Sequence, residues 1–415
     1  MGWLVAARLA SDPVRGSSAS TSAVVGVGGL VALQVLFLQS PGFVSSQGAL
    51  PFWAGVLVVL IGDSCALLAV GQASRVLVWP VGLALAGLVG LAGTALLPIV
   101  TGPAVAIVLV VVQCALCALV GVALLPQTPE PIRVHGMAGP ARATGAAILA
   151  LVVIFLWQFY IDTPLPFPRW AIPLVGVVAV LAAAVIAHRS QPHADQVPGL
   201  LRLVAVPTVL SLGLAVTVPA GLWVTRPNPL VTAAASPTVR VMTYNIRSGV
   251  DTTGQLRPDA IVQVIRTYDP DVVVLQEVGR GWSIHAGTDV LAYLERQLNF
   301  TAVYRAAADQ QFDNVVLSRL PMTTVSTGML PDVGGQHRSY VAVRVDVAGR
   351  PLMVLGTQLE DRSAVQIRAL RGIVGTTTPA VIVGDLNLHP DEPEVTELNG
   401  LVVAALDVGD AGGQS

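Results

Sequence analysis

Ala380-Val-Ile-Val-Gly-Asp-Leu-Asn387 is a short apolar run that ends on two polar residues, Asp385 and Asn387. Successive side chains of a strand point to opposite faces, so the i, i+2 spacing of these two residues puts both on one face. They stand at the end of the strand, where a site would open. The stretch therefore predicts a buried strand that delivers polar side chains at its C-terminal tip.

Two stretches further upstream repeat this pattern. Val239-Arg-Val-Met-Thr-Tyr-Asn-Ile246 carries Asn245 at its end, and Asp271-Val-Val-Val-Leu-Gln-Glu277 carries Glu277. Three buried strands would thus each present a carboxylate or a carboxamide. Oxygen ligands of this kind, without Cys or a tight His pair, suit a hard cation such as Mg²⁺ and the oxygens of a phosphate.

Together these stretches resemble the endonuclease/exonuclease/phosphatase superfamily, the deoxyribonuclease-I-like phosphoesterases. The resemblance covers roughly residues 239 to 407 and implies hydrolysis of phosphoesters that depends on Mg²⁺ or Mn²⁺. Five elements occur in the family's order: Thr243-Tyr-Asn-Ile246, Leu275-Gln-Glu-Val278, Asp313-Asn-Val-Val-Leu-Ser-Arg319, Gly356-Thr-Gln-Leu359 and Gly384-Asp-Leu-Asn387.

The resemblance assigns a role to each polar strand end. Glu277 would be the metal ligand, and Asn245 would contact the metal or a substrate phosphate oxygen. Asp385 would orient or deprotonate the attacking water, and Asn387 would stabilise charge that develops on the phosphate oxygens.

Two further site residues come with departures from the family pattern. Asn314 would lie near the substrate phosphate, but the family's preceding Gly is Asp313 here, and a nearby acid disfavours a polyanion. Gln358 stands where many relatives have His, in Thr357-Gln-Leu359. Its amide still binds a phosphate oxygen as a substrate-binding group, yet it carries no positive charge and moves no proton.

The C-terminal end departs from the family more strongly. Relatives continue with an Arg-Ile-Asp-Tyr-like strand and a terminal Ser-Asp-His, whereas this sequence runs through Leu401–Asp407 to Gly412-Gly-Gln-Ser415. We therefore expect a domain that is incomplete at its C-terminus and at most trace activity. Among the histidines of the domain, His389 is nearest to the predicted site.

Composition separates the chain into two kinds of material. The whole is 53% hydrophobic and 12% charged, with a mean hydropathy of +0.71, which ordinary soluble domains do not show. Five acidic residues precede residue 226 and twenty follow it. We predict a multi-pass transmembrane domain over 1–225, a linker over 226–238 and the phosphoesterase-like domain over 239–415.

Seven apolar stretches are each near the ~20 residues that cross a bilayer as a helix. They lie at about 22–40, 50–72, 77–99, 102–126, 144–161, 170–187 and 200–224. With seven spans, only Arg169 flanks them on one side. The other side receives Arg8, Arg15, Arg75, Arg133, Arg142, Arg189 and Arg202. The positive-inside rule then places the N-terminus in the cytoplasm and the C-terminal domain outside the cytoplasm, at the cell membrane.

Asp63 is the one acidic residue well inside a predicted span. A carboxylate there is costly and indicates function. Pairing with Ser64 or with Arg75 is an equally good structural explanation. Cys114 and Cys117 form a C-x-x-C pair, for which packing in a helix bundle is the favoured interpretation.

After residue 238, strands alternate with helices. We expect strands at 239–246, 271–277, 301–305, 313–318, 338–347, 351–358 and 379–385, and helices at 258–268, 288–298 and 361–375. Two mixed sheets packed face to face between helices, an α/β/β/α sandwich, account for this order.

A polytopic protein with such a C-terminal domain is similar to the membrane proteins that remodel the lipid of GPI anchors. This similarity predicts a membrane lipid or glycolipid head group as substrate. An extracytoplasmic nuclease is the first alternative, although fifteen Arg against twenty acids from residue 226 on make nucleic acid an unlikely partner. A non-catalytic protein that binds a head group or a partner is the second.

Overall fold

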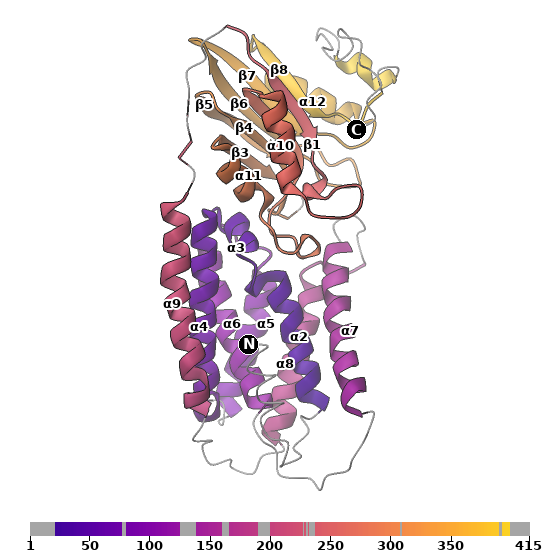
Figure 1. Cartoon of the computed structure of the whole chain (residues 1–415). Helices are drawn as coiled ribbons and strands as arrows, with labels where there is room; N and C mark the ends of the chain where they lie inside the picture. The colour runs from indigo at the N-terminus through magenta and orange to yellow at the C-terminus, as the bar shows by residue number, and fades with distance from the viewer. Residues whose placement is uncertain are drawn as a thin grey trace. The chain divides into compact units, whose positions relative to one another are not determined.

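The structure is a computed structural model of the 415-residue chain. It describes residues 21–76, 80–124, 138–159, 166–189, 200–226, 228–229, 231, 237–307, 309–389 and 392–398. The chain divides into two compact units, Met1–Thr225 and Arg226–Ser415 (Figure 1). We call them the helical unit and the C-terminal unit.

The helical unit consists of apolar helices in the residues that the structure describes. They are α2 (Thr21–Leu33), the π-helical turn η1 (Gln34–Leu38), α3 (Pro41–Gly48), α4 (Phe52–Val76), α5 (Pro80–Leu96), α6 (Ala104–Ala123), α7 (Ala138–Phe159), α8 (Ala171–Arg189) and α9 (Leu200–Val224). Six segments of the described chain are long and apolar enough to cross a membrane, and α5 is apolar but shorter. The predicted number of seven spans therefore stays a prediction.

Large apolar side chains lie on the outside of these helices as well as between them. Val216 on α9, Ile107 on α6 and Val81 on α5 are each about two-thirds exposed. Helices that are apolar all round suit a lipid environment. Inside, α2 approaches α8 so closely that a side chain at Gly29 would collide with the backbone of Gly176. Small residues at such crossings are typical of packed membrane helices.

The C-terminal unit contains two four-stranded mixed sheets. The first has the order β1-β2-β4-β3, with β1 (Val241–Asn245), β2 (Val272–Gly279), β3 (Thr301–Ala306) and β4 (Phe312–Ser318). The second has the order β5-β6-β7-β8, with β5 (Met322–Met329), β6 (Ser339–Val347), β7 (Arg350–Gln358) and β8 (Ala380–Asp385). The predicted mixed-sheet α/β domain is thus confirmed.

Three apolar clusters hold these elements together. Helices α10 (Pro258–Tyr268) and α11 (Val290–Leu298) pack on the first sheet through residues such as Ile265, Leu294 and Leu275. Valines of β2, β4, β6 and β7, among them Val274 and Val343, lie between the two sheets. On the second sheet, α12 (Ala364–Val374) packs with the short 3₁₀ segment η4 (Pro393–Leu398).

Strand β5 was not among the predicted strands. Its sequence, Met322-Thr-Thr-Val-Ser-Thr-Gly-Met329, is mostly polar and has no run of buried apolar residues. It forms the edge of its sheet and pairs only with β6. An edge strand buries little, so its hydrophobic pattern is weak.

Strand direction brings the polar ends of four strands to the same region. Strand β1 runs parallel to β2, with Asn245 opposite Gln276, and β7 runs parallel to β8, with Gln358 opposite Asp385. Both parallel pairs therefore end on the residues that the sequence singled out.

Candidate active site

Four of the predicted site residues meet through hydrogen bonds, although they come from both sheets. The Asn245 amide nitrogen donates to Glu277 Oε1 and to Asp385 Oδ2, both at 2.9 Å. The Gln358 amide nitrogen also donates to Glu277 Oε1, at 2.9 Å. Strands β1 and β2 of the first sheet and β7 and β8 of the second thus contribute one residue each to what we call the carboxylate–carboxamide group.

A bulge in β2 sets the direction of Glu277. The pairing of β2 with β4 shifts register between Leu275 and Val278, and Glu277 between them has a φ of 56°. This left-handed conformation is uncommon for a residue other than glycine and is often found where strain serves a site. The extra residue of a bulge redirects side chains, which here lets the carboxylate face Asn245 and Gln358.

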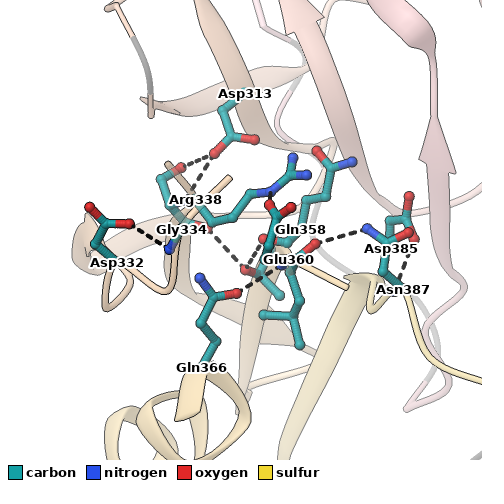
Figure 2. Close-up of polar contacts among 12 residues, drawn as sticks. Asp313, Asp332, Gly334, Arg338, Gln358, Glu360, Gln366, Asp385 and Asn387 are labelled. Atoms are coloured by element: carbon teal, nitrogen blue, oxygen red, sulfur yellow. Dashed lines mark hydrogen bonds and ion pairs between the residues drawn. The ribbon is translucent and has the colours of Figure 1, made fainter. Parts of the chain in front are cut away.

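Asn387 lies beside Asp385, and Figure 2 shows the two side chains next to each other. The Asn387 backbone N–H donates to Asp385 Oδ1 at 3.2 Å, and its amide nitrogen donates to the backbone oxygen of Leu359 at 2.8 Å. Its φ of 47° is again left-handed, which Asn tolerates better than most residues. Asn387 therefore ties the loop after β8 to the end of β7.

Asn314 lies apart from the carboxylate–carboxamide group. Its side chain is fully buried, and its amide nitrogen donates to the backbone oxygen of Ser339 at 3.0 Å. Its Oδ1 has no hydrogen-bond partner. The structure thus places Asn314 on β4, where its side chain contacts β6 of the other sheet, with one buried oxygen left unpaired among the described residues.

Ser339 is the centre of this buried layer, and sequence reasoning missed it. Its backbone N–H and its hydroxyl both donate to Asp313 Oδ2, at 3.0 and 2.6 Å. Its backbone oxygen accepts from Thr357 Oγ1 at 2.9 Å as well as from Asn314. One serine therefore links β4, β6 and β7 directly under the site.

Asp313 was expected to disfavour a polyanion. Its carboxylate instead accepts the two hydrogen bonds from Ser339. It is 1% exposed, and burial raises the pKa of its carboxyl group to about 7, against the opposing effect of the hydrogen bonds from Ser339 and the charge of Arg338. The acid therefore lies inside the domain and stabilises the contact between the sheets.

Arg338 is the second residue that the sequence did not single out. Its Nε donates to Glu360 Oε2 at 3.0 Å, and its side chain is only 9% exposed. Figure 2 shows this pair close to Gln358, with Gln366 of α12 below it in the view. Because β6 is antiparallel to β7, with Tyr340 opposite Thr357, the start of the predicted strand 338–347 had to lie beside the end of β7. The sequence alone gives no signal for that pairing.

The donor set fits a divalent metal of the magnesium type. Two carboxylates, Glu277 and Asp385, flank one carboxamide, and Gln358 Oε1 is a buried oxygen without a partner. Within the described part of the chain, no three His, Cys, Asp or Glu residues gather into a metal-binding cluster. Mg²⁺ commonly uses only one or two carboxylates and keeps several waters, so this sparse oxygen set suits it.

In the described residues, no histidine contacts the carboxylate–carboxamide group. His389 is exposed, and its backbone N–H donates to Glu392 Oε2 at 3.0 Å. His285 packs against Trp282 and His337 lies in an exposed loop near Asp332. The expected incompleteness at the C-terminus concerns residues 399–415, which lie outside the described residues.

Comparison with known proteins gives a family for the C-terminal unit. Residues 242–405 match the model of the endonuclease/exonuclease/phosphatase family. A Beutenbergia cavernae DSM 12333 endonuclease/exonuclease/phosphatase structure is 30% identical over 38% of this chain and 50% of its own, with a TM-score of 0.30. The present chain thus spans about half the length of that protein.

Two further solved structures are similar to the chain. The human Nocturnin catalytic domain with bound sulfate is 19% identical over 43% of this chain and 76% of its own, with a TM-score of 0.33. ANGEL2, a 2',3'-cyclic phosphatase, is 20% identical over 39% of this chain and 56% of its own, with a TM-score of 0.30. No curated protein matches the chain. The family match over the strands of the site leads to one conclusion: residues 242–405 form an endonuclease/exonuclease/phosphatase family domain.

Proposed function

We propose that this chain is a membrane-anchored, metal-dependent phosphoesterase that acts outside the cytoplasm on a phosphoester in a lipid head group. The observation that carries the proposal is the carboxylate–carboxamide group, in which Asn245, Glu277, Gln358 and Asp385 converge from four strands of two sheets. Carboxylates with carboxamides at strand ends suit phosphoester chemistry.

In this proposal Glu277 and Asn245 hold one Mg²⁺ or Mn²⁺. When bound, such a cation acts as a Lewis acid that neutralises charge on the phosphate. Asp385 accepts hydrogen bonds from the Asn245 amide and from the Asn387 backbone N–H, which fix the position of its carboxylate. Asp385 orients that water or takes its proton, while the amides of Gln358 and Asn387 donate to phosphate oxygens.

Asn314 is the weakest member of this assignment, because its fully buried side chain forms its hydrogen bonds with Ser339 and not with the carboxylate–carboxamide group. We propose that it supports the phosphate site from below through the Ser339 layer. The packing of α10 and α11 on one sheet and α12 on the other supports an α/β/β/α sandwich as the frame of the site.

Membrane placement rests on the helical unit. Six candidate spans, with the shorter apolar helix α5 counted as a seventh, and the arginines gathered on one side of the predicted spans support a multi-pass protein with a cytoplasmic N-terminus and an extracytoplasmic C-terminal unit. The predicted tether over 226–238 then leaves the C-terminal unit at the outer membrane surface. Lipid head groups, including those of glycolipids, are the phosphoesters within its reach, which agrees with the resemblance to GPI-anchor remodelling proteins.

The test uses the full chain in lipid nanodiscs with Mg²⁺. We expect slow release of phosphate or head group from inositol-type phospholipids, lost with EDTA, because no described histidine contacts the site to move protons. Cleavage of single-stranded DNA without lipid turnover would replace this proposal with the nuclease. Saturable head-group binding without any release would instead favour a non-catalytic binding protein.

A further inference from the structure

The candidate site is divided between two sheets, so the spacing of its two halves depends on how the sheets are aligned. Asn245 and Glu277 belong to the first sheet, and Gln358 and Asp385 belong to the second. Valine side chains pack between the sheets, and apolar contact has no preferred direction. Hydrogen bonds are directional, so a few of them close to the strand ends can fix the alignment.

Ser339, the first residue of β6, makes such contacts with the first sheet. Its backbone N–H and its hydroxyl both donate to Asp313 Oδ2, at 3.0 and 2.6 Å. Its backbone oxygen accepts from the Asn314 amide at 3.0 Å. Asp313 and Asn314 are neighbours on β4, so the start of β6 is joined to β4 in both directions. Figure 2 shows Asp313 above Gln358 in the view.

The same serine is connected to the end of β7. Thr357 Oγ1 donates to the Ser339 backbone oxygen at 2.9 Å. Gln358 follows Thr357 in the chain, and its amide nitrogen donates to Glu277 Oε1 at 2.9 Å. Asp313 is therefore linked, through Ser339 and Thr357, to the residue whose amide contacts the carboxylate of the predicted metal ligand.

Two features of Asp313 are unfavourable for folding. Its φ of 152° lies in a region where residues other than glycine are rare, and glycine would adopt it without strain. Its side chain is buried, and its Oδ1 has no hydrogen-bond partner among the described residues. Strained backbone of this kind clusters at functional sites. A glycine would avoid both costs, so the carboxyl group at this position indicates a role in the site.

We propose that Asp313 is a positioning residue: it fixes Ser339 and thereby aligns the two sheets at their polar ends, which sets the position of the Glu277 carboxylate. The proposal rests on the proposed phosphoesterase function, in which Glu277 holds the metal. One oxygen of the Asp313 carboxyl group accepts both hydrogen bonds from Ser339, so an amide oxygen in its place would serve as well. Shape and hydrogen bonding, rather than charge, are then what this position requires.

The experiment compares Asp313→Gly with Asp313→Asn in the full chain in lipid nanodiscs. The glycine removes the acceptor oxygen, so we expect Mn²⁺ binding, followed by electron paramagnetic resonance, to weaken at least about fivefold. In initial rates with inositol-type phospholipid, kcat should fall about tenfold with KM little changed, because the misplaced groups act in the transition state. Asp313→Asn keeps an acceptor oxygen and should hold both quantities within about threefold of wild type.

Hydrogen exchange at the backbone amides of Ser339 and Gln358 measures the alignment without metal or substrate. Exchange should be faster than wild type in Asp313→Gly and close to wild type in Asp313→Asn. If this difference is seen while the wild-type chain shows no turnover, the proposed function fails and the positioning role of Asp313 stands.

Two further variants complete the test. Ser339→Ala keeps the backbone hydrogen bonds and loses the hydroxyl, so it should weaken Mn²⁺ binding about threefold, and it replaces Asp313→Gly if that variant does not fold. The matched control is Ala348→Gly, which also replaces a residue of positive φ (53°), in the turn at the other ends of β6 and β7, and should change nothing. Wild-type exchange and affinity in Asp313→Gly, or in Ser339→Ala where it is the replacement, would overturn the proposal. An Asp313→Asn variant as impaired as the glycine variant would also overturn it, because the charge would then be what matters.

Discussion

The two units contain the same small arrangement in different surroundings. In the C-terminal unit, Glu277 Oε1 accepts from the amides of Asn245 and Gln358, and in the helical unit Asp63 Oδ1 accepts from those of Gln39 and Gln113. The first lies at strand ends, in a unit whose charged residues are many. The second lies among apolar helices.

The comparison shows that a carboxylate held by two carboxamides does not by itself indicate one function. In the C-terminal unit a second carboxylate, Asp385, joins the arrangement, and the doubled charge suits a divalent cation. In the helical unit Asp63 has no acidic companion among the described hydrogen-bond partners, and the cost of its single charge is set by the apolar surroundings.

The largest expected effect concerns where each unit lies. A C-terminal reporter that is active only in the cytoplasm should stay silent on the full chain, because the predicted spans place the C-terminal unit outside. Reporter activity in intact cells is the measurement, with the reporter on a cytoplasmic protein as control. A bright signal would reverse the orientation and remove a surface lipid as substrate.

The next prediction tests the catalytic role of Asp385 separately from metal binding. Asp385→Asn keeps the side-chain shape and should lower Mg²⁺-dependent hydrolysis by about 10²–10⁴-fold, the usual contribution of a positioned acid–base group. Initial rates with lipid substrate measure it. Asp332→Asn, in an exposed loop away from the carboxylate–carboxamide group, is the control. Turnover that survives Asp385→Asn would mean that another residue serves as the base.

A third prediction compares the effect of an acidic substitution at an exposed apolar residue in each of the two units. Val216→Asp in α9 should hinder insertion by roughly 3 kcal/mol, because an acid in the middle of a span is costly. Val325→Asp on the edge strand β5 should be nearly neutral, because charges are common on edge strands. The fraction of chains that activate the cytoplasmic reporter should rise only for Val216→Asp. Equal behaviour of the two variants would argue against a lipid-facing α9.

A smaller effect is expected on metal affinity. Glu277→Gln removes the charge of the principal ligand and should weaken Mn²⁺ binding at least tenfold, or ~1.4 kcal/mol. Mn²⁺ titration of the full chain, followed by electron paramagnetic resonance, measures this. Asp63→Asn serves as the control from the helical unit and should leave the titration unchanged. An unaltered titration with Glu277→Gln would remove it from the metal site.

The last prediction concerns the pH dependence of stability. Burial raises the pKa of Asp313 to about 7 in the folded protein, from its ordinary value of 3.8. Between pH ~4 and ~7 the folded state binds more protons than the unfolded state, so the free energy of unfolding falls as pH rises and then levels off above pH ~7. Asp313→Asn should flatten this part of the profile. Thermal midpoints of the full chain from pH 4 to 8 measure it, and an identical slope in the variant would contradict the assignment.

Much of the C-terminal unit was predictable because its strands are apolar and end on polar residues. The predicted helix at 258–268 coincides with α10. Three residues of the carboxylate–carboxamide group were named from strand ends, and Gln358 was named from the family resemblance. Strand β5 was missed because an edge strand buries little. In the helical unit the apolar stretches predicted the helices. Helix α5 has only 17 residues, so the number of membrane spans stays a prediction.

What the sequence could not give depends on contacts between distant strands and on backbone detail. Ser339 and Arg338 lie beside the site only because β6 pairs antiparallel with β7. The sequence around Glu277 does not indicate the bulge, because the residue with the left-handed backbone conformation is not a glycine. The interruption at Gln39 and the meeting of Gln39 with Gln113 on Asp63 likewise appear only when the helices pack.

The division of the site between the two sheets has a thermodynamic consequence. Because Asn245 and Glu277 belong to one sheet and Gln358 and Asp385 to the other, any ligand that needs all four binds only when the sheets are packed together. By mass action, such a ligand at 100 times its dissociation constant raises the free energy of unfolding by about 2.7 kcal/mol. The backbone amides of the strands whose valine side chains pack between the two sheets should then exchange with solvent more slowly. Occupancy of the site is therefore also readable as protection of backbone amides far from the ligand.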